Sequence, residues 1–221
     1  MIELFREFWA ASGVLDLIAL VASIAYVVLA ARNSVWCFVF GAIGAAVWAW
    51  LSFAVYELWL DALLQVFYFI MSGYGIYRWR SSLRVLPKPS STSPLDAEST
   101  QSHPMTTERP ITRMSLREHG LLFALGIPLS LLFGKLFADF TPAAATYLDA
   151  FTTVFSVLAT WLVVERKLEN WLYWIVLDAA YIYLYQTRGA FVLSLIMIIY
   201  IVIAIFGYIN WRRMCRLTPT G

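Results

Sequence analysis

The chain has 221 residues, of which 61% are hydrophobic, 17% are aromatic and 14% are charged, and its formal net charge is +2. Its mean hydropathy of +0.72 lies well outside the range of a water-soluble domain of this length. The basic residues sit between apolar runs and form no single patch, so nucleic-acid binding is not expected. The composition indicates an integral membrane protein.

Seven predominantly apolar runs are long enough to cross the roughly 30 Å of hydrocarbon in a bilayer as helices. In chain order the predicted spans are residues 14–31, 35–55, 58–77, 120–138, 147–164, 168–186 and 189–210. The sixth is the weakest, because its strictly apolar part is short and contains Asp178. The sequence therefore predicts an all-α integral membrane protein with seven transmembrane helices.

Three segments outside these spans have different patterns. Residues 1–13 mix large apolar side chains with charged ones, which predicts a short interfacial helix. Residues 81–117 carry five prolines among Ser and Thr and have no apolar periodicity, which predicts a mobile, disordered linker. Residues 213–221 are predicted to form a tail beyond the last helix.

Lys and Arg are distributed unevenly between the two sides of the predicted membrane protein. Seven spans place 13 of them on one side and 3 on the other. Because cytoplasmic loops carry the excess, the amino terminus is predicted outside and the linker and carboxyl terminus in the cytoplasm. Cys37 and Cys215 then lie near or in the cytoplasm, where both thiols stay reduced, and their spacing indicates neither a disulfide framework nor a metal site.

Several functions lack the residues that they require. Both histidines, His103 and His119, lie in the linker or at its edge, so no intramembrane nucleophile–His pair or His-rich metal site is expected. There is no Gly-rich phosphate-binding loop. The sequence therefore predicts a protein that is not an enzyme and that needs no cofactor or metal.

The segments after the linker resemble those before it. Short identities align the first three helices with the last three: Leu15-Asp16 with Leu148-Asp149, Trp36 with Trp171, Gly75 with Gly207 and Trp79 with Trp211. Two three-helix units joined by one helix must enter the membrane in the same sense. This predicts a parallel 3+1+3 repeat, in which residues 14–80 and 141–212 are the repeats and 118–140 is the connector, with a substrate site between the repeats near the bilayer midplane.

Two of the predicted helices carry a narrow stripe of polar and aromatic side chains at helical spacing. In the third helix the stripe is Gln65, Tyr68, Ser72, Gly75 and Trp79, and in the sixth it is Trp171, Trp174, Asp178, Tyr181 and Tyr185. We expect the two stripes to face one cavity.

Asp178 carries the most information, because a carboxylate at the bilayer centre costs about 2.5–3.5 kcal/mol and must face protein or water. Ligand contact or proton handling is the functional interpretation, and a protonated Asp bonded to a neighbouring helix is the structural one. Gln65 is either an amide partner for a ligand or a link between helices. Trp171 is either a stacking group or part of an interfacial aromatic belt. Lys167 and Glu169 are either a substrate gate or the solvated cap of the sixth helix.

On these residues the chain resembles the PnuC family of bacterial nicotinamide riboside transporters. The resemblance covers nearly the whole chain apart from the linker. Its two motifs are Asp61-Ala-Leu-Leu-Gln65-Val-Phe-Tyr68, continued by Gly75, Tyr77 and Trp79, and Lys167-Leu-Glu169-Asn170-Trp171-Leu-Tyr-Trp174 with Asp178, followed by the stretch from Tyr200 to Trp211.

The resemblance implies a full-length SWEET-like fold in the bacterial inner membrane and uptake by facilitated diffusion, made one-way by a cytoplasmic kinase that phosphorylates the substrate. The predicted substrate-binding residues are Gln65, Tyr68, Asn170, Trp171, Trp174, Asp178, Tyr181 and Tyr200, with Lys167 and Glu169 as gate candidates. Thiamine or riboflavin transport and a non-transporting membrane receptor remain the alternatives. The expected partners are the small vitamin substrate and the bilayer, and homo-oligomerisation stays open.

Overall fold

The computed structural model describes residues 13–54, 59–80, 110–140, 146–189 and 191–217. The predicted interfacial helix and most of the predicted linker lie outside these residues. The described helices are α2 (Val14–Ala31), α3 (Cys37–Ala54), α4 (Trp59–Arg80), α5 (Leu116–Phe140), α6 (Thr146–Val164), α7 (Asn170–Thr187) and α8 (Phe191–Leu217). Each predicted span therefore corresponds to one helix, and α8 continues past the predicted end at residue 210.

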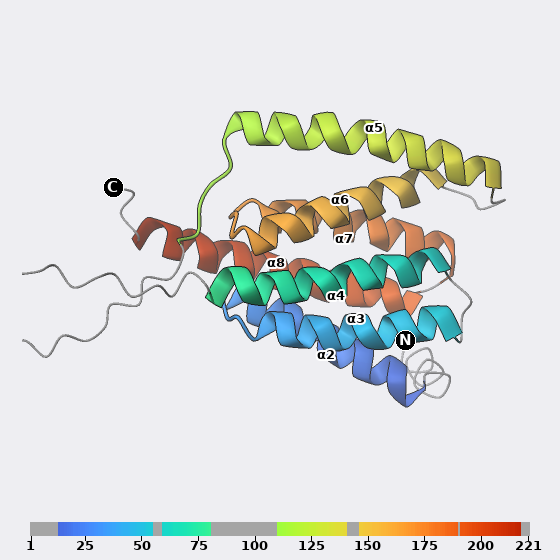
Figure 1. The fold of residues 1–221 in the computed structure, drawn as a ribbon, viewed down its shortest axis with the longest axis horizontal. Helices are drawn as coiled ribbons and strands as arrows, with labels where there is room; N and C mark the ends of the chain where they lie inside the picture. Colours follow the sequence, from blue (N-terminus) through green and yellow to red (C-terminus); the bar gives the residue numbers. More distant parts are fainter. Residues whose placement is uncertain (1–12, 55–58, 81–109, 141–145, 190, 218–221) are drawn as a thin grey trace, which may run out of the picture.

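Five of these helices, α2, α3, α5, α6 and α8, are long and apolar enough to cross a membrane. The two others, α4 and α7, are the helices with the polar stripes, whose polar side chains lower their hydropathy. Both run alongside the five apolar helices through the bundle (Figure 1). The chain is thus an all-helical, multi-pass membrane protein.

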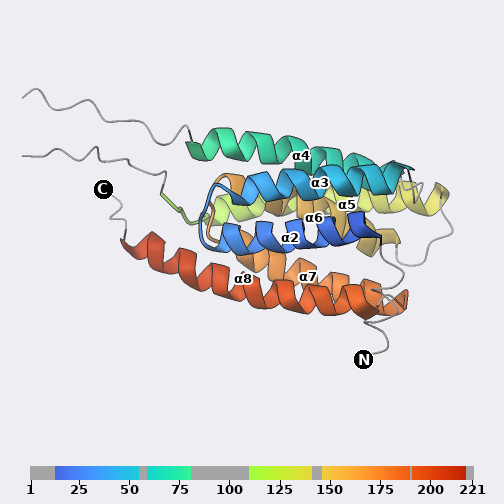
Figure 2. The same ribbon diagram turned by 90° about the horizontal axis from the view of Figure 1, so that it is seen from below.

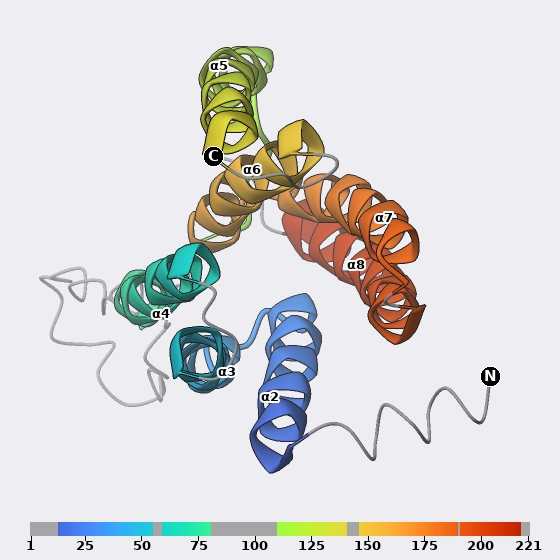
Figure 3. The ribbon, with the colours of Figure 1, turned by 90° about the vertical axis from the view of Figure 1, so that its right-hand side faces the viewer.

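The helices pack in two sets of three (Figure 3). In the first set α3 lies between α2 and α4, and in the second α7 lies between α6 and α8. The sets meet where α2 packs on α8 and where α4 packs on α6, while α5 lies at the outside against α6. Each contact between the sets therefore joins the first helix of one set to the third helix of the other.

One end of the bundle, here called the linker end, contains the carboxyl ends of α2, α4, α6 and α8 (Figure 1). The turns after α2 and after α6 have the same conformation there. Asn33 and Arg166 both adopt left-handed backbone angles, with φ of 56° and 54°. Their amides both donate to the carbonyl three residues earlier, at 2.9 Å from Asn33 to Ala30 and at 3.0 Å from Arg166 to Val163.

This shared turn corrects the alignment of Trp36 with Trp171. The Trp171 ring packs against Gly207 and meets the Trp211 ring edge-on at 5.5 Å. In the first set the same place is occupied by Phe38, which packs against Gly75 and meets the Trp79 ring edge-on at 4.9 Å. Trp36 is 57% exposed instead. The pairs Gly75 with Gly207 and Trp79 with Trp211 take equivalent places.

We predict that Gly75→Ala destabilises the protein, because a Cβ at this position would overlap the Phe38 ring. Phe38 is 1% exposed and cannot move aside freely, so the overpacking should cost about 1–3 kcal/mol. Thermal unfolding of the purified protein in detergent would measure this as a lower Tm.

Gly73→Ala is the matched control, since Gly73 lies on the same helix with no atom within 4 Å of an added Cβ. Its Tm should be unchanged or slightly raised, because Ala is the better helix former. Equal effects of the two substitutions would contradict the close packing of α3 on α4.

Candidate functional site

Hydroxyl groups from three helices meet near the centre of the bundle. The Ser156 hydroxyl of α6 lies 3.3 Å from the Tyr181 hydroxyl of α7. The Tyr68 phenol of α4 also interacts with Ser156, and it lies within electrostatic range of Tyr181. Two of the predicted site residues, Tyr68 and Tyr181, are therefore brought together through a serine that was not predicted.

A similar contact joins α2 and α8, the other pair of helices that packs across the two sets. The Tyr200 phenol of α8 interacts with Ser23 of α2, whose hydroxyl also donates to the Ala19 carbonyl at 2.8 Å. Tyr68 and Tyr200 occupy corresponding positions on the third helix of their sets. Each tyrosine reaches a serine on the first helix of the other set.

Asp178 of α7 lies near one tyrosine of each of these two contacts. Its side chain is buried, at 3% exposure, and it interacts electrostatically with both Tyr181 and Tyr200. Phenols and carboxyl groups are strong hydrogen-bonding groups that require partners inside a membrane. The centre of the bundle is thus polar, although every helix around it is predominantly apolar.

Two aromatic rings border this polar centre. Trp174 is half-buried on α7, one turn from Asp178, and packs against both hydrophobic clusters of the bundle. Tyr26 of α2 packs over Gly41 of α3, where an added Cβ would lie 2.9 Å from its ring. Tyr26 also lies within electrostatic range of Tyr68.

Tyr26, Ser23 and Ser156 were not predicted as site residues. The signal that could have found the serines is the alignment that pairs Leu15-Asp16 with Leu148-Asp149, because it also places Ser23 on Ser156.

Gln65 lies three residues before Tyr68 on α4 and is half-buried, so the two share a helix face. Two cavities of the structure lie elsewhere. One of about 400 Å³ is at the end of α8, and one of about 350 Å³ is between α2 and α3. Among the residues that the structure describes, no three His, Cys, Asp or Glu side chains gather as a metal site.

Asn170 and Trp171 lie nearer the linker end, about 10 Å along α7 from Asp178. Both are buried, at 0% and 2% exposure. The Asn170 side-chain amide nitrogen, Nδ2, donates to the Lys167 carbonyl at 2.6 Å. Asn170 Oδ1 and the Trp171 indole nitrogen have no hydrogen-bond partner within the described part of the chain. A hydrogen-bond acceptor and a hydrogen-bond donor that lack partners in the described part of the chain are thus adjacent.

The gate candidates Lys167 and Glu169 hold the segment that leads into α5. Lys167 Nζ pairs with Glu118 at 2.6 Å, and a Glu169 carboxylate oxygen accepts from the Met114 amide at 2.7 Å. The side chain of Ile111 in the same segment is 5% exposed and belongs to the core. Residues 110–115, here called the strap, are therefore fixed across the turn between α6 and α7.

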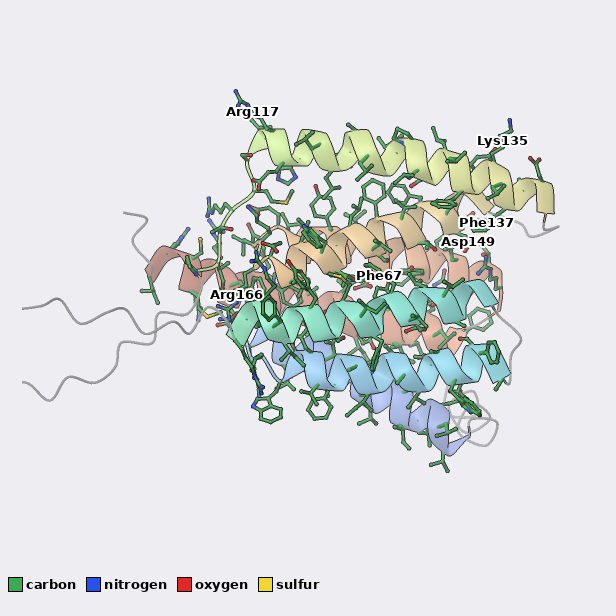
Figure 4. The ribbon with its side chains drawn as sticks, in the orientation of Figure 1. Phe67, Arg117, Lys135, Phe137, Asp149 and Arg166 are labelled. Atoms are coloured by element: carbon green, nitrogen blue, oxygen red, sulfur yellow. The ribbon has the colours of Figure 1, made fainter. Side chains whose placement is uncertain are left out.

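Backbone hydrogen bonds add to this attachment. The Thr112 amide donates to the Arg166 carbonyl at 3.0 Å, and the Leu168 amide donates to the Thr112 carbonyl at 2.9 Å. Arg166 itself is 3% exposed and lies over the Trp79 ring, with its guanidinium carbon 4.3 Å from the ring centroid. Figure 4 shows Arg166 at the linker end of the bundle.

Matching bonds connect the two sets at the linker end. The Trp79 indole donates to the Val164 carbonyl, and the Trp211 indole donates to the Ala30 carbonyl, both at 3.0 Å. Each tryptophan thus caps the last turn of the first helix of the other set. The two sets are closed against each other at this end.

Ion pairs lie at both ends of the bundle. At the linker end, Arg78 of α4 makes a two-pronged pair with Glu165, with contacts of 2.7, 2.8 and 3.1 Å. At the opposite end, where Figure 4 shows Asp149, this carboxylate pairs with Arg188. The first pair joins the two sets, whereas the second lies within the second set.

These features define the class of protein. It is a polytopic membrane protein with a polar, aromatic centre between two sets of helices and a closed linker end. Residues 13–213 match the family described as "Nicotinamide mononucleotide transporter". The chain belongs to this family.

The curated relatives agree with this assignment. The chain is 25% identical over 213 residues to the nicotinamide riboside transporter PnuC of Escherichia coli K12, covering 91% of this chain and 86% of the relative. It is 23% identical over 215 residues to PnuC of Neisseria mucosa, covering 94% and 73%. The fold is similar to that in "Crystal structure of the Vitamin B3 transporter PnuC", with a TM-score of 0.70, 21% identity and coverage of 97% and 85%.

The Arg78–Glu165 pair generates a prediction about the joint between the two sets. We expect Arg78→Ala to lower the Tm of the purified protein, since it leaves the half-buried Glu165 carboxylate without its two-pronged partner. The loss should be roughly 1 kcal/mol. Arg80→Ala, an exposed position on the same last turn, is the control and should change the Tm little. A Tm that falls equally for both would mean that only surface charge matters.

Proposed function

We propose that this protein carries nicotinamide riboside into the cell by facilitated diffusion. The observation that carries the proposal is the buried Asp178 carboxyl, which interacts with the phenols of Tyr181 on α7 and Tyr200 on α8 and lies one helical turn from Trp174. The names of the curated relatives support the same substrate, and the family description names the corresponding mononucleotide. Phosphorylation of the riboside by a cytoplasmic kinase would then prevent its return.

The scaffold of this transporter is a parallel 3+1+3 repeat with α5 as the connector. Three observations support it: the equivalent turns at Asn33 and Arg166, the reciprocal indole–carbonyl bonds, and the reciprocal contacts of α2 with α8 and α4 with α6. A substrate near the axis of such a repeat contacts both sets.

The chemistry of the centre suits a flat cation that carries a sugar. Trp174 and Tyr26 supply ring faces, which attract an aromatic cation. Asp178 supplies a carboxyl group for the positive ring, and the tyrosine and serine hydroxyls match the ribose. The amide of Gln65, or the adjacent Asn170 Oδ1 and Trp171 indole, supplies a donor and an acceptor for the carboxamide.

In this proposal the linker end is the cytoplasmic gate. Trp79, Trp211 and the strap close it in the described conformation. Lys167 and Glu169 contribute to the gate by holding the strap, without a direct contact to substrate. Substrate release then requires the two sets to separate at this end.

Uptake of radiolabelled nicotinamide riboside into proteoliposomes tests the proposal. We expect saturable, gradient-driven flux with the native chain and at least a tenfold loss with Trp174→Ala or Gln65→Ala, about 1.4 kcal/mol or more of lost binding. Tyr26→Ala should raise KM more than it lowers the maximal rate, because it removes one ring face.

The control is Tyr74→Ala, an aromatic residue on α4 that stacks on Trp161 away from the centre and should retain uptake. Each variant is compared at equal reconstituted amounts and with equal helix content. Flux of thiamine or riboflavin, but not of the riboside, would reassign the substrate. Ligand binding without any flux would support a receptor.

The proposed orientation places Cys215 in the cytoplasm, and this can be read with a membrane-impermeant maleimide. Cys215 is partly exposed, whereas Cys37 is buried. We expect labelling in inverted membrane vesicles and none in right-side-out vesicles, and Cys215→Ser should abolish the signal. The opposite pattern would reverse the orientation.

A further inference from the structure

The outer face of α8 is apolar along most of its length. Its large exposed side chains recur at helical spacing and are 43–65% exposed: Ile198, Val202, Ile205, Phe206 and Ile209. From Phe191 to Ile209 the helix spans about 28 Å, close to the roughly 30 Å of a hydrocarbon core. This face therefore lies against lipid along the full depth of the core.

The same face becomes basic immediately beyond Ile209. Arg212, Arg213 and Arg216 follow Ile209 at three, four and seven residues, so they continue the lipid-facing stripe. They lie about 5–10 Å further along the helix axis, which is the depth of phospholipid headgroups. The arginines are thus exposed in the layer where lipid phosphates lie.

These three arginines surround a shared hollow. Together with Tyr208 and Ile209 they line an open cavity of about 400 Å³ with no acidic residue in its lining. Guanidinium groups donate paired hydrogen bonds that match phosphate oxygens. The Tyr208 phenol adds one further donor, and Ile209 provides an apolar edge on the membrane side.

The opposite face of the same turns is fixed to the bundle. The Trp211 indole donates to Ala30, and the Asn210 amide donates to the Ala31 carbonyl at 2.9 Å. Met214 and Cys215 pack against the core. The end of α8 projects beyond the other helices, as Figures 1 and 2 show, yet these contacts hold it at a set depth and angle.

We propose that Arg212, Arg213 and Arg216 form a binding site for the phosphate of an anionic phospholipid in the leaflet at the linker end. The basic residues of this end also influence the orientation in which the protein inserts into the membrane. That effect depends on how many basic residues there are and not on how they are arranged. A cavity shared by three guanidiniums, at headgroup depth and on the lipid-facing side, adds a defined site for one headgroup. The proposal does not depend on what the protein transports.

Native mass spectrometry of the full-length protein in detergent tests the site, with phosphatidylglycerol and phosphatidylcholine as the added lipids. The variant is R212Q/R213Q/R216Q. The matched control is R32Q/R113Q/R117Q, which removes the same charge from exposed positions at the same end. We expect about tenfold weaker phosphatidylglycerol binding in the first variant, less than about twofold in the control, and unchanged phosphatidylcholine binding in both.

Equal weakening in both variants, or equal binding of the two lipids by the native chain, would overturn the proposal. Displacement of phosphatidylglycerol by glycerol 3-phosphate or inorganic phosphate would assign the site to a soluble phosphate and overturn it as well. If the Gln variant does not fold, lipid binding by the native chain is compared with lipid binding by R212K/R213K/R216K instead. A phosphatidylglycerol preference that is weaker in the Lys variant, because ammonium groups lose the paired hydrogen bonds, and that falls from about 50 to about 500 mM salt, supports the site. A preference that is equal in the two proteins, or insensitive to salt, contradicts it.

Discussion

Polar side chains inside a bilayer must find their partners within the protein, and the arrangement of this bundle follows from that constraint. Asp178 is 3% exposed, and its neighbours Tyr181 and Tyr200 come from α7 and α8. A carboxyl group turned toward lipid would cost about 2.5–3.5 kcal/mol. Together with the buried Asn170 and Trp171, Asp178 therefore fixes the rotation of α7 about its own axis. The apolar faces of α2, α3, α5, α6 and α8 are left to meet the hydrocarbon.

Around this centre, a position that holds a large residue in one set corresponds to a position that holds a small residue in the other. Under the alignment that pairs Ser23 with Ser156, Tyr26 corresponds to Ala159 and Gly41 to Trp174. In the first set the large ring comes from the first helix and packs over a glycine. In the second set it comes from the second helix, and Trp174 packs on a cluster that contains Ala159. A similar volume is thus filled by a ring from the first helix in one set and by a ring from the second helix in the other. Close-packed interiors tolerate such volume-conserving changes.

This exchange allows the two sets to differ in chemistry without differing in shape. The position that corresponds to Asp178 in the first set is Ala45, which is 5% exposed. At this pair of positions the second set therefore supplies the carboxyl group. In the proposed repeat, two similar sets can in this way enclose an asymmetric ligand, which has one charged end and one neutral end.

The helices could be predicted from the sequence because the thickness of a bilayer imposes a length on every span. The polar centre could be predicted in part, since Tyr68, Asp178 and Tyr181 follow helical spacing. The pairing of Trp36 with Trp171 was wrong, because identical residues need not be equivalent. The turns at Asn33 and Arg166 set the register, and they place Phe38 opposite Gly75.

Other parts of the site had no signal in the sequence beyond the internal alignment. Ser23 and Ser156 are hydroxyls in apolar helices, where a serine most often bonds its own backbone, and Tyr200 and Tyr68, their partners in the other set, are distant in the sequence. The burial of Ile111 could not be predicted either, because it lies among Pro, Ser and Thr without apolar periodicity. Its place depends on the strap meeting the turn after α6, which is a contact between distant segments.

The linker end also indicates how the two sets can separate. The Trp79–Val164 and Trp211–Ala30 bonds each join the third helix of one set to the first helix of the other. In the proposed repeat they lie on opposite sides of the axis, so a rotation that opens the end lengthens both together. Arg78–Glu165 also joins the two sets at this end and must yield in the same movement. Interactions that break together make partial opening unfavourable, so the closed and open forms of this end are expected to behave as two discrete states.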